Sequence, residues 1–282
     1  MRCHSVSLST EFIVLRRAAF AASVSRAHFP MYDPHHPPPC AVSVRIPAYN
    51  EEVLLGRTLD SVHASFAALE IAKSGYEIIV CDNNSTDGTA REAAVHGAQV
   101  VFEPHNQISK ARNAAAGRAK HPWLIFLDAD TLLNPALLRA TLSALASGRI
   151  CGGGTLVQFD RSLANDFANA LLLTCWNKIS AGLALAAGSY IFCLRSAWEA
   201  VGGFEEGVYA GEEIFFSRKV KRWGRERRLR FVVLSGTPIV TSARKIQWHG
   251  RRELLMHLLS MMRPGAIRRR EDCALWYERP PQ

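Results

Sequence analysis

The feature that most constrains the fold of this chain is a regular alternation of strand-like and helix-like segments after residue 41. Four short segments of apolar and β-branched residues are typical of strands, and segments with apolar residues at helical spacing separate them. The predicted strands are residues 42–46, 77–81, 98–102 and 123–127. This alternation predicts an α/β fold, in which a Rossmann-like, mostly parallel sheet carries helices on both faces.

Polar residues follow three of these strands, in the segments 47–52, 82–88 and 128–130. Ligands of parallel α/β sheets bind beyond the carboxyl ends of the strands, so we expect these three segments to converge on one crevice. We also expect Pro47 to end the first strand, because proline lacks the N–H group that a central strand needs. Asp87, or its neighbour Thr86, is expected to cap the helix that follows.

The sequence after residue 130 has a weaker pattern. Asn134 followed by Pro135 predicts the start of a helix, because asparagine accepts hydrogen bonds from free backbone N–H groups and proline suits the first helical turn. Beyond residue 150 the segments are less regular. Strands are predicted at residues 151–159, 189–194 and 229–234, and helices within residues 163–187 and 211–224.

With 282 residues, of which 48% are hydrophobic, the chain is long enough for one large domain with a sizeable core. Its seven cysteines are scattered without a CxxC pair, which indicates reduced thiols rather than a zinc site or a disulfide framework. No run of eighteen apolar residues occurs, so no membrane span is predicted. Neither GxxxxGK[ST] nor GxGxxG is present, which argues against P-loop enzymes and ordinary dinucleotide dehydrogenases.

The formal net charge of +9 is concentrated towards the C-terminus. Residues 218–282 hold seventeen basic and five acidic side chains, whereas residues 41–217 hold thirteen basic and eighteen acidic ones. A nucleic-acid-binding domain is typically basic as a whole, so we expect no nucleic acid partner. Residues 241–282 are interpreted as a basic, amphipathic helical tail that packs against the domain, with peripheral contact to a membrane surface as the alternative.

Residues 1–40 differ from the rest of the chain, because they are rich in Ser, Arg and Ala and poor in acidic residues. This composition is typical of transit peptides, but the segment lacks the compact apolar stretch of a secretory signal. We favour the interpretation that translation starts at Met31, and a targeting segment is the alternative. Residues 1–40 are therefore treated as an N-terminal extension, disordered or not translated, and residues 41–240 as the domain.

Candidate ligands for a metal ion and a nucleotide stand at the strand ends. Asp128 and Asp130 form a D-x-D pair, and carboxylates suit Mg²⁺ or Mn²⁺ bound together with phosphate; helix capping is the alternative role. Asp82 could accept hydrogen bonds from a nucleobase or a sugar, or it could form an Asx turn. Tyr49 could stack on a base or lie at the rim, and Arg112 could bind a diphosphate or pair with an aspartate of the same crevice.

Five short motifs occur in a fixed order along the chain. They are Pro47-Ala48-Tyr49-Asn50-Glu51-Glu52, Asp82-Asn83-Asn84-Ser85-Thr86-Asp87-Gly88-Thr89, Ala111-Arg112-Asn113, Asp128-Ala129-Asp130 and Gly202-Gly203-Phe204-Glu205-Glu206. Each motif alone is weak, but the ordered set is specific and resembles glycosyltransferase family 2 over residues 42–240. The resemblance implies a GT-A fold, a UDP- or GDP-sugar donor, a Mg²⁺ or Mn²⁺ ion, a sugar or lipid-linked acceptor, and inversion at the anomeric carbon.

The resemblance also implies a role for each residue that matches a family motif. Three residues would line the nucleotide pocket: Pro47, Tyr49 and Glu51. Asp82 would hold the base, and Arg112 would belong to the same wall. Asp128 would face the donor ribose or sugar and share the metal ion with Asp130, which would be its main ligand.

The general base of the family usually lies in an acidic pair, often Glu-Asp, that opens a late helix, and Glu212 with Glu213 matches this position. We prefer Glu213 as the base, keep Glu212 as the alternative, and expect a carboxylate of ordinary pKa that is ionised at neutral pH. First-turn acids that favour the helix dipole are the structural alternative. The family's QxxRW-type element is absent; Arg244, Trp248 and His249 lie where it, or a further phosphate or metal contact, is expected.

The sequence therefore predicts a metal-dependent inverting glycosyltransferase with a nucleotide-sugar-binding half (41–135), an acceptor and catalytic half (136–240) and a C-terminal acceptor-side extension. Two alternatives are a sugar-phosphate nucleotidyltransferase, whose glycine-rich basic loop is missing from residues 47–52, and a non-catalytic protein that binds RNA or anionic lipid. We expect a cytoplasmic enzyme that acts in cell-envelope polysaccharide synthesis. Contact with the inner face of the membrane through residues 241–282 is the alternative to packing of this tail against the domain.

Overall fold

The computed structural model describes residues 41–159, 174, 177–178, 180–242, 244, 263, 265–273 and 277. By its internal contacts the chain divides into a unit of residues 1–31 and a unit of residues 32–282, and every described residue belongs to the second. The N-terminal extension, much of the segment 163–187 and most of the tail lie outside the described residues.

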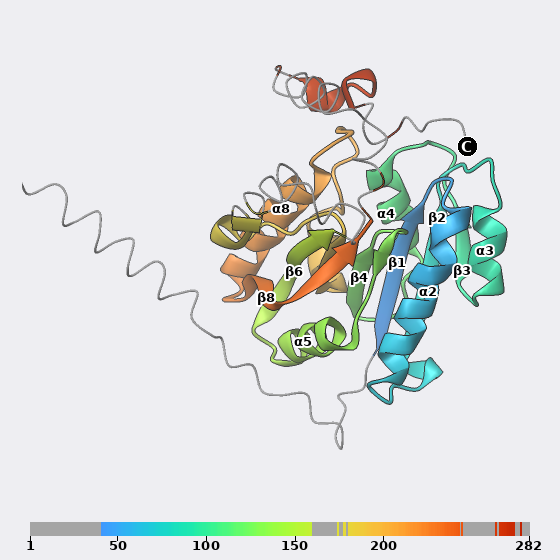
Figure 1. Ribbon diagram of the computed structural model, residues 1–282. Helices are drawn as coiled ribbons and strands as arrows, with labels where there is room; N and C mark the ends of the chain where they lie inside the picture. The colour runs from blue at the N-terminus through green and yellow to red at the C-terminus, as the bar shows by residue number, and fades with distance from the viewer. Residues whose placement is uncertain are drawn as a thin grey trace, which may run out of the picture. The chain divides into compact units, whose positions relative to one another are not determined.

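Among the described residues, eight strands form a single sheet in the order β3-β2-β1-β4-β7-β6-β8-β5 (Figure 1). The strands are β1 (Val42–Ala48), β2 (Tyr76–Asp82), β3 (Gln99–Phe102), β4 (Trp123–Leu127), β5 (Thr131–Leu132), β6 (Ile150–Phe159), β7 (Tyr190–Leu194) and β8 (Arg230–Thr241). All neighbours from β3 to β4 run parallel, as do β6 and β8. β7 is antiparallel to both β4 and β6, and β5 is antiparallel to β8. The predicted parallel, Rossmann-like sheet is therefore the part from β3 to β4.

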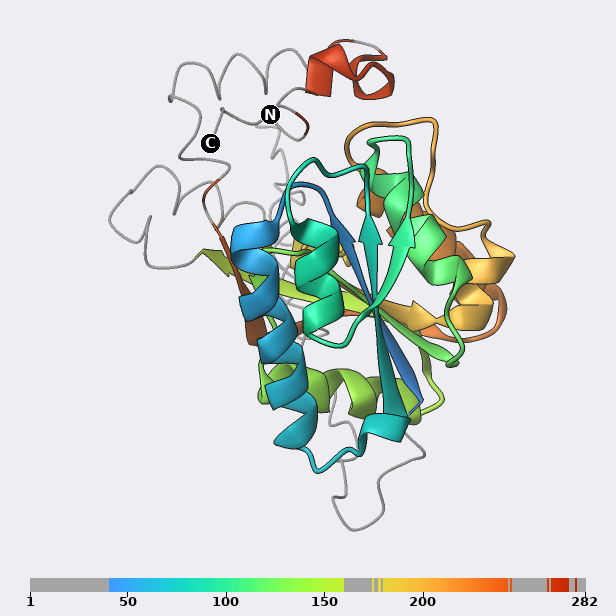
Figure 2. The same ribbon diagram turned by 90° about the vertical axis from the view of Figure 1, so that its right-hand side faces the viewer.

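Helices cover both faces of this sheet (Figures 1 and 2). They are α2 (Glu52–Ala67), α3 (Thr89–Val95), α4 (Ile108–Gly117), α5 (Pro135–Ala146), α7 (Arg195–Ala200) and α8 (Glu212–Glu226), with the short 3₁₀ turns η1 (Lys73–Gly75), η3 (Ala266–Arg268) and η4 (Glu271–Cys273). On one face α2 packs against α3 and α5. On the other face α4, α7 and α8 share one buried cluster with β4 and β7. No helix in the described part of the chain has the length and apolar character that crossing a membrane requires.

The strand β4 is the centre of the fold, as its apolar run predicts. It lies between β1 and β7, and its residues from Leu124 to Leu127 are completely buried. Phe126 packs edge-on against the ring of Phe204, with 4.9 Å between ring centroids, and Phe204 stacks on Phe216 of α8 at 4.2 Å. These aromatic contacts fix α8, and hence the acidic residues at its start, against the central strand.

Most of the predicted elements are found within a few residues of their expected ends, but the prediction that Pro47 ends the first strand is wrong. β1 continues to Ala48, which lies in register with Asp82 of β2. The pairing of β1 with β4 ends at Arg45, so Pro47 lies beyond the positions at which β4 pairs with this strand.

The predicted cap of α5 is present, whereas α3 has Gly88 at its N-cap position and no side-chain cap there. The side chain of Asn134 accepts a hydrogen bond from the backbone N–H of Leu137 at the start of α5. Asp87, rather than Thr86, supports the start of α3, because its carboxylate accepts a hydrogen bond of 3.0 Å from the backbone N–H of Thr89. The two-residue strand β5 and the six-residue helix α7 are not predicted, because elements this short show no periodicity.

Candidate active site

The three polar segments that follow strands meet at the carboxyl edge of β1, β2 and β4, where they surround a pocket. The residues that line it are Pro47, Ala48, Tyr49, Glu51, Asn83, Asn106, Ile108, Asp128, Ala129, Asp130 and Tyr277. The convergence follows from the parallel pairing of these strands, whose carboxyl ends lie at one edge. The pocket combines aromatic and apolar walls with carboxylates, which suits a ligand that has a flat ring and a charged group that binds a cation.

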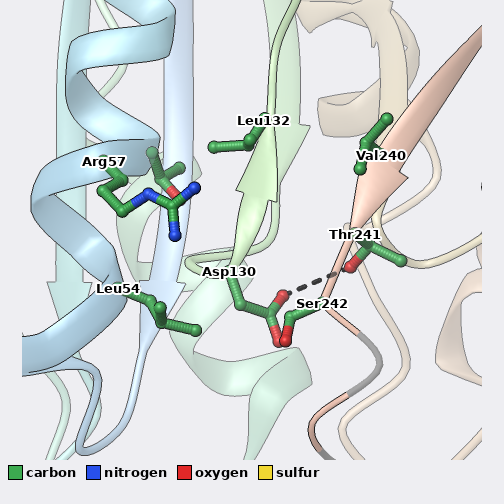
Figure 3. A pocket seen from close by; sticks show the side chains of 8 residues that line it. Leu54, Arg57, Asp130, Leu132, Val240, Thr241 and Ser242 are labelled. Atoms are coloured by element: carbon green, nitrogen blue, oxygen red, sulfur yellow. Dashed lines mark hydrogen bonds between the residues drawn. The ribbon is translucent and has the colours of Figure 1, made fainter. Parts of the chain in front are cut away.

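Asp130 lines both this pocket and a second one. It is 8% exposed, and its Oδ1 lies 3.4 Å from the hydroxyl groups of both Thr131 and Thr241. Its backbone carbonyl accepts a hydrogen bond from Ser242, which joins the end of β8 to the D-x-D segment. Figure 3 shows the second pocket, which lies between α2 and the end of β8 and has the carboxylate of Asp130 beside Thr241 and Ser242. Asp130 can therefore be reached from both pockets.

The side chain of Arg112 connects several residues of the site. It is completely buried on α4, and its Nη1 donates to Oε1 of Glu212 at 2.5 Å. Its Nη2 donates to Oδ1 of Asp128 at 2.9 Å and to the carbonyl of Gly188 at 2.9 Å. Burial alone would lower the pKa of Arg112, but the carboxylates of Asp128 and Glu212 raise it above the ordinary value. Of the two roles predicted for Arg112, the structure shows the pairing with an aspartate.

The acidic pair 212–213 begins α8 after Gly211, whose φ of +73° places it in the left-handed region that glycine favours. Glu212 is 4% exposed and pairs with Arg112, so its charge is compensated. Glu213 is partly buried, and its carboxyl carbon would lie 4.0 Å from a Cβ atom at Gly188. Burial and the adjacent Glu212 carboxylate raise the pKa of Glu213 to about 8. The expectation of an ordinary pKa for this residue is therefore wrong.

The other predicted nucleotide contacts occupy different positions around the pocket. Pro47 is buried and Tyr49 partly buried, and both line it. Asp82 is 8% exposed, does not line the pocket, and accepts a hydrogen bond of 2.9 Å from the backbone N–H of Ser85. This bond is the turn interaction that the sequence left open as the alternative role of Asp82.

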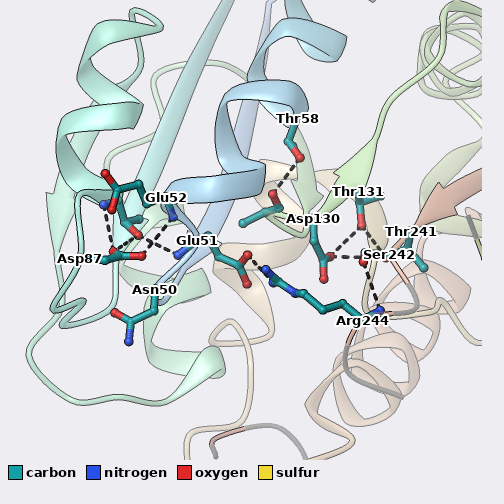
Figure 4. A network of polar contacts seen from close by, with 12 residues as sticks. Asn50, Glu51, Glu52, Thr58, Asp87, Asp130, Thr131, Thr241, Ser242 and Arg244 are labelled. Atoms are coloured by element: carbon teal, nitrogen blue, oxygen red, sulfur yellow. Dashed lines mark hydrogen bonds and ion pairs between the residues drawn. The ribbon is translucent and has the colours of Figure 1, made fainter. Parts of the chain in front are cut away.

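Glu51 lines the pocket and forms an ion pair with Arg244, a residue that follows β8. Nη2 of Arg244 lies 2.6 Å from Oε2 of Glu51, and their side chains are 18% and 4% exposed. Figure 4 shows the side chain of Arg244 extending from the end of β8 past Asp130 to reach Glu51. Of the three residues considered for the QxxRW region, Arg244 is thus placed at the site, and Trp248 and His249 lie outside the described residues.

Two further motifs mainly hold the structure together. Asn113 of the Ala-Arg-Asn motif accepts a hydrogen bond from the backbone N–H of Phe204 and donates one to its carbonyl. Gly203 has a φ of +69°, and a Cβ atom there would lie 2.5 Å from Oδ1 of Asn113. The glycine therefore allows the loop before α8 to approach α4, which brings the Glu212 region to Arg112.

Sequence reasoning missed four residues that line the pocket. Asn83 holds the surrounding loops, since its Nδ2 donates to the carbonyls of Glu103 and His105. The other three are Asn106, Ile108 and Tyr277. The asparagine at position 83 lies within a recognised motif and could have been considered. No local pattern indicates that Tyr277, at least 147 residues from the other lining residues, belongs to this site.

The site offers carboxylate donors for a divalent cation. In the described part of the chain no three His, Cys, Asp or Glu side chains are grouped to hold a metal ion. Mg²⁺ and Mn²⁺ commonly take only one or two carboxylates and complete their shell with water and substrate phosphate. Asp130 fits this requirement, because it is a buried carboxylate that lines the pocket, and its hydrogen-bond partners among the described side chains are hydroxyl groups. Asp128 is less suited, because Arg112 already compensates its charge.

Comparisons with known proteins agree with the motifs. The family model described as Glycosyl transferase family 2 matches residues 43–166. An uncharacterized glycosyltransferase of Mycobacterium tuberculosis is 39% identical over 108 residues, which are 38% of this chain and 45% of that protein. Glycosyltransferase AglE of Haloferax volcanii is 32% identical over 191 residues, which are 63% of this chain and 60% of that protein. The matched regions thus span less than two thirds of either relative.

Among solved structures, a mannosyltransferase from Pyrobaculum calidifontis in complex with GDP-Man and Mn²⁺ superposes with a TM-score of 0.64 at 20% sequence identity. The alignment covers 90% of this chain and 68% of that one. At this level of identity the superposition establishes the fold, which is that of the GT-A glycosyltransferases. Residues 43–166 thus match the family model of glycosyltransferase family 2, and the domain that contains them has the GT-A fold.

Proposed function

We propose that this enzyme transfers a sugar, with inversion, from a nucleoside-diphosphate sugar to an acceptor hydroxyl group. The observation that supports the proposal best is the convergence of Asp128, Asp130, Arg112 and Glu213 from three separate segments of the chain. A nucleotidyltransferase has no comparable support, because the relatives and the solved structure described above are all glycosyltransferases.

In the proposed donor complex, the nucleoside lies between Tyr49 and the wall of Ile108. Asp130 would hold a divalent cation, and when bound this ion neutralises the charge that develops on the departing diphosphate. Asp128, held in place by Arg112, faces the ribose or the donor sugar. Mn²⁺ and GDP-mannose in the Pyrobaculum structure support a cation and a nucleotide-sugar donor of this class.

Glu213 is proposed to accept the proton of the attacking acceptor hydroxyl. Glu212 cannot do so as easily, because its carboxylate already accepts a hydrogen bond from Arg112. The raised pKa of Glu213 suits this role, since a general base works best when its pKa is near the operating pH. A single attack from the side opposite the diphosphate inverts the anomeric carbon, and no second nucleophile is then needed.

The direct test is a thermal-shift comparison of UDP- and GDP-sugars with and without Mn²⁺. We expect one nucleotide class to raise the melting temperature only when Mn²⁺ is present, because a ligand at about 100 times its Kd stabilises a fold by about 2.7 kcal/mol. Asp130→Asn should remove the Mn²⁺-dependent part of the shift. The matched control is Asp60→Asn, an exposed aspartate on α2 that contacts His96 rather than the pocket. Equal shifts in all three proteins would contradict the proposal.

A further inference from the structure

The C-terminal part of the chain contributes to the candidate donor pocket. We define the strap as residues 265–273 together with Tyr277, which are the described residues of this region apart from Arg263. The strap packs on the loop 208–210, which leads directly into α8. Ala210, Cys273 and Tyr277 form a buried cluster, and the backbone N–H of Tyr209 donates to the carbonyl of Ile267 at 2.6 Å.

Tyr277 lines the pocket, and its hydroxyl group is hydrogen-bonded to the backbone of two neighbouring segments. The side chain is 7% exposed and lines the pocket together with Pro47 and Tyr49. Its hydroxyl donates to the carbonyl of Tyr209 at 3.1 Å and accepts from the backbone N–H of Ile108 at 3.5 Å. Burial, followed by the nearby Glu212 carboxylate, raises the pKa of Tyr277, so the hydroxyl stays neutral and keeps both bonds.

Arg270 connects the strap to Asn106, another residue that lines the same pocket. Its guanidinium lies 5.3 Å from the centroid of the Tyr277 ring, and its Nη2 donates to Oδ1 of Asn106 at 3.4 Å. Asn106 in turn donates to the carbonyl of Asn83, and both asparagines line the pocket. The strap therefore supplies one lining residue, Tyr277, and contacts a second one, Asn106.

We propose that Tyr277 recognises the nucleoside of the donor through its ring and positions the start of α8 through its hydroxyl group. This inference rests on the proposed function and extends it to a residue outside the family motifs. The flat rings of Tyr277 and Tyr49, with the apolar ring of Pro47, provide the kind of surface that a nucleobase or ribose packs against. The hydroxyl links this surface to Tyr209, three residues before Glu212.

The test separates the two roles of Tyr277 by comparing Tyr277→Ala with Tyr277→Phe. The affinities of UDP and GDP are measured by calorimetry in the presence of Mn²⁺. Loss of the ring in the Ala variant should weaken binding of the preferred nucleotide by about 2- to 12-fold, the range that aromatic packing typically contributes. The Phe variant keeps the ring and should bind within about twofold of the wild-type affinity, while donor turnover falls because the loop 208–210 loses its hydrogen bond.

Arg269→Ala is the matched control. Arg269 is in the same strap but 54% exposed, and it pairs with Asp272 instead of contacting the pocket. A second measurement needs no variant: hydrogen exchange of residues 265–273 in the wild-type protein should slow when the preferred nucleotide and Mn²⁺ are added.

The results distinguish this inference from the proposed function. If the wild-type protein binds neither UDP nor GDP, both proposals fail. If it binds one of them, but Tyr277→Ala binds it equally well and the exchange of residues 265–273 is unchanged, the role of Tyr277 alone is refuted. If the Ala variant does not fold, unchanged exchange in the wild-type protein is sufficient to refute it.

Discussion

The two halves of the sheet supply the site in different ways. From β3 to β4 all strands run parallel, and the candidate residues Pro47, Asp128 and Asp130 lie within or directly after a strand. From β7 to β5 most neighbours are antiparallel, and the acidic pair 212–213 comes from a helix start after a glycine. In the first half the parallel strand direction brings the candidate residues to one edge, whereas in the second half tertiary packing positions the acidic pair.

Buried ion pairs join the two halves at the site. Arg112 of α4 holds Glu212 of α8, and Arg244 after β8 holds Glu51 before α2. In each pair a cation on one half compensates a carboxylate on the other, and both carboxylates are 4% exposed. Because an unpaired buried charge is costly, these pairs make the geometry of the site depend on both halves being correctly packed.

The largest expected effect concerns Glu213 on α8, in the second half of the molecule. Glu213→Gln removes the proposed base but keeps the size of the side chain. Turnover should fall by about 10²–10⁴-fold, the usual contribution of positioned proton transfer. Binding of the donor nucleotide with Mn²⁺ should stay within a factor of about two, since Asp130 and the nucleotide pocket are unchanged.

Glu212→Gln is the informative companion to this variant, because it changes the neighbouring carboxylate and weakens its pairing with Arg112. If Glu212→Gln lost turnover while Glu213→Gln kept it, the assignment of the base would be reversed. Steady-state rates and calorimetry on the two variants decide between these outcomes.

The second prediction tests the connection between the halves. Arg112→Met leaves the buried carboxylate of Glu212 and that of Asp128 without their cation, which should lower the free energy of unfolding by about 3–5 kcal/mol. The double variant Arg112→Met/Glu212→Gln should recover part of this loss, because one of the two uncompensated charges is removed. Urea unfolding measures both; a double variant that is no more stable than the single one would show that the ion pair is not the cause.

The third prediction uses the raised pKa of Glu213. Its folded-state pKa of about 8 lies above the ordinary value of 4.5, so the carboxyl group holds a proton at neutral pH. As a base it must lose that proton, and kcat/KM for the donor should rise about tenfold between pH 7 and pH 9. A flat profile would show that the ionised form is not required.

The raised pKa of Glu213 also predicts that the stability of the fold decreases with rising pH. The folded chain binds this proton more tightly than the unfolded chain does, so the fold should lose stability as the pH rises from 4.5 towards 8. Glu213→Gln cannot titrate at this position and should lose less stability over that range. Unfolding free energies measured for both proteins at several pH values test this difference.

The two halves also differ in how well their helices and strands could be predicted from the sequence. Residues 42–135 contain elements whose periodicity is strong, and β4 and the cap at Asn134 are found where they were predicted. In the second half β6 and β7 were also predicted, but β8 extends seven residues beyond the predicted end at 234, to Thr241. The added residues of β8 pair with β5, which lies far from them in the sequence. A local pattern therefore could not indicate this extension.

For the site, the chemistry of a residue could be predicted better than its partner. The D-x-D segment and the acidic pair were found from spacing and resemblance, and pairing of Arg112 with an aspartate was foreseen as one of two roles. Three features could not be predicted: the pairing partners Glu212 and Arg244, and the place of Tyr277 in the pocket. Each depends on a contact between segments about 70–190 residues apart, which only the folded chain brings together. The raised pKa of Glu213 has the same origin, since burial is a tertiary property.

The smallest expected effect concerns the boundary between the halves. Asn134 follows the D-x-D segment closely and is also polar, but its side chain accepts a hydrogen bond of 2.8 Å from the backbone N–H of Leu137. Asn134→Ala should therefore lower the free energy of unfolding by about 1 kcal/mol, the usual value of a helix cap, and leave nucleotide affinity unchanged. Asp130→Asn, only four residues away, should do the opposite and lose affinity with little loss of stability. If Asn134→Ala weakened Mn²⁺-dependent binding as much as Asp130→Asn does, the cation site would have to extend beyond the carboxylates assigned to it.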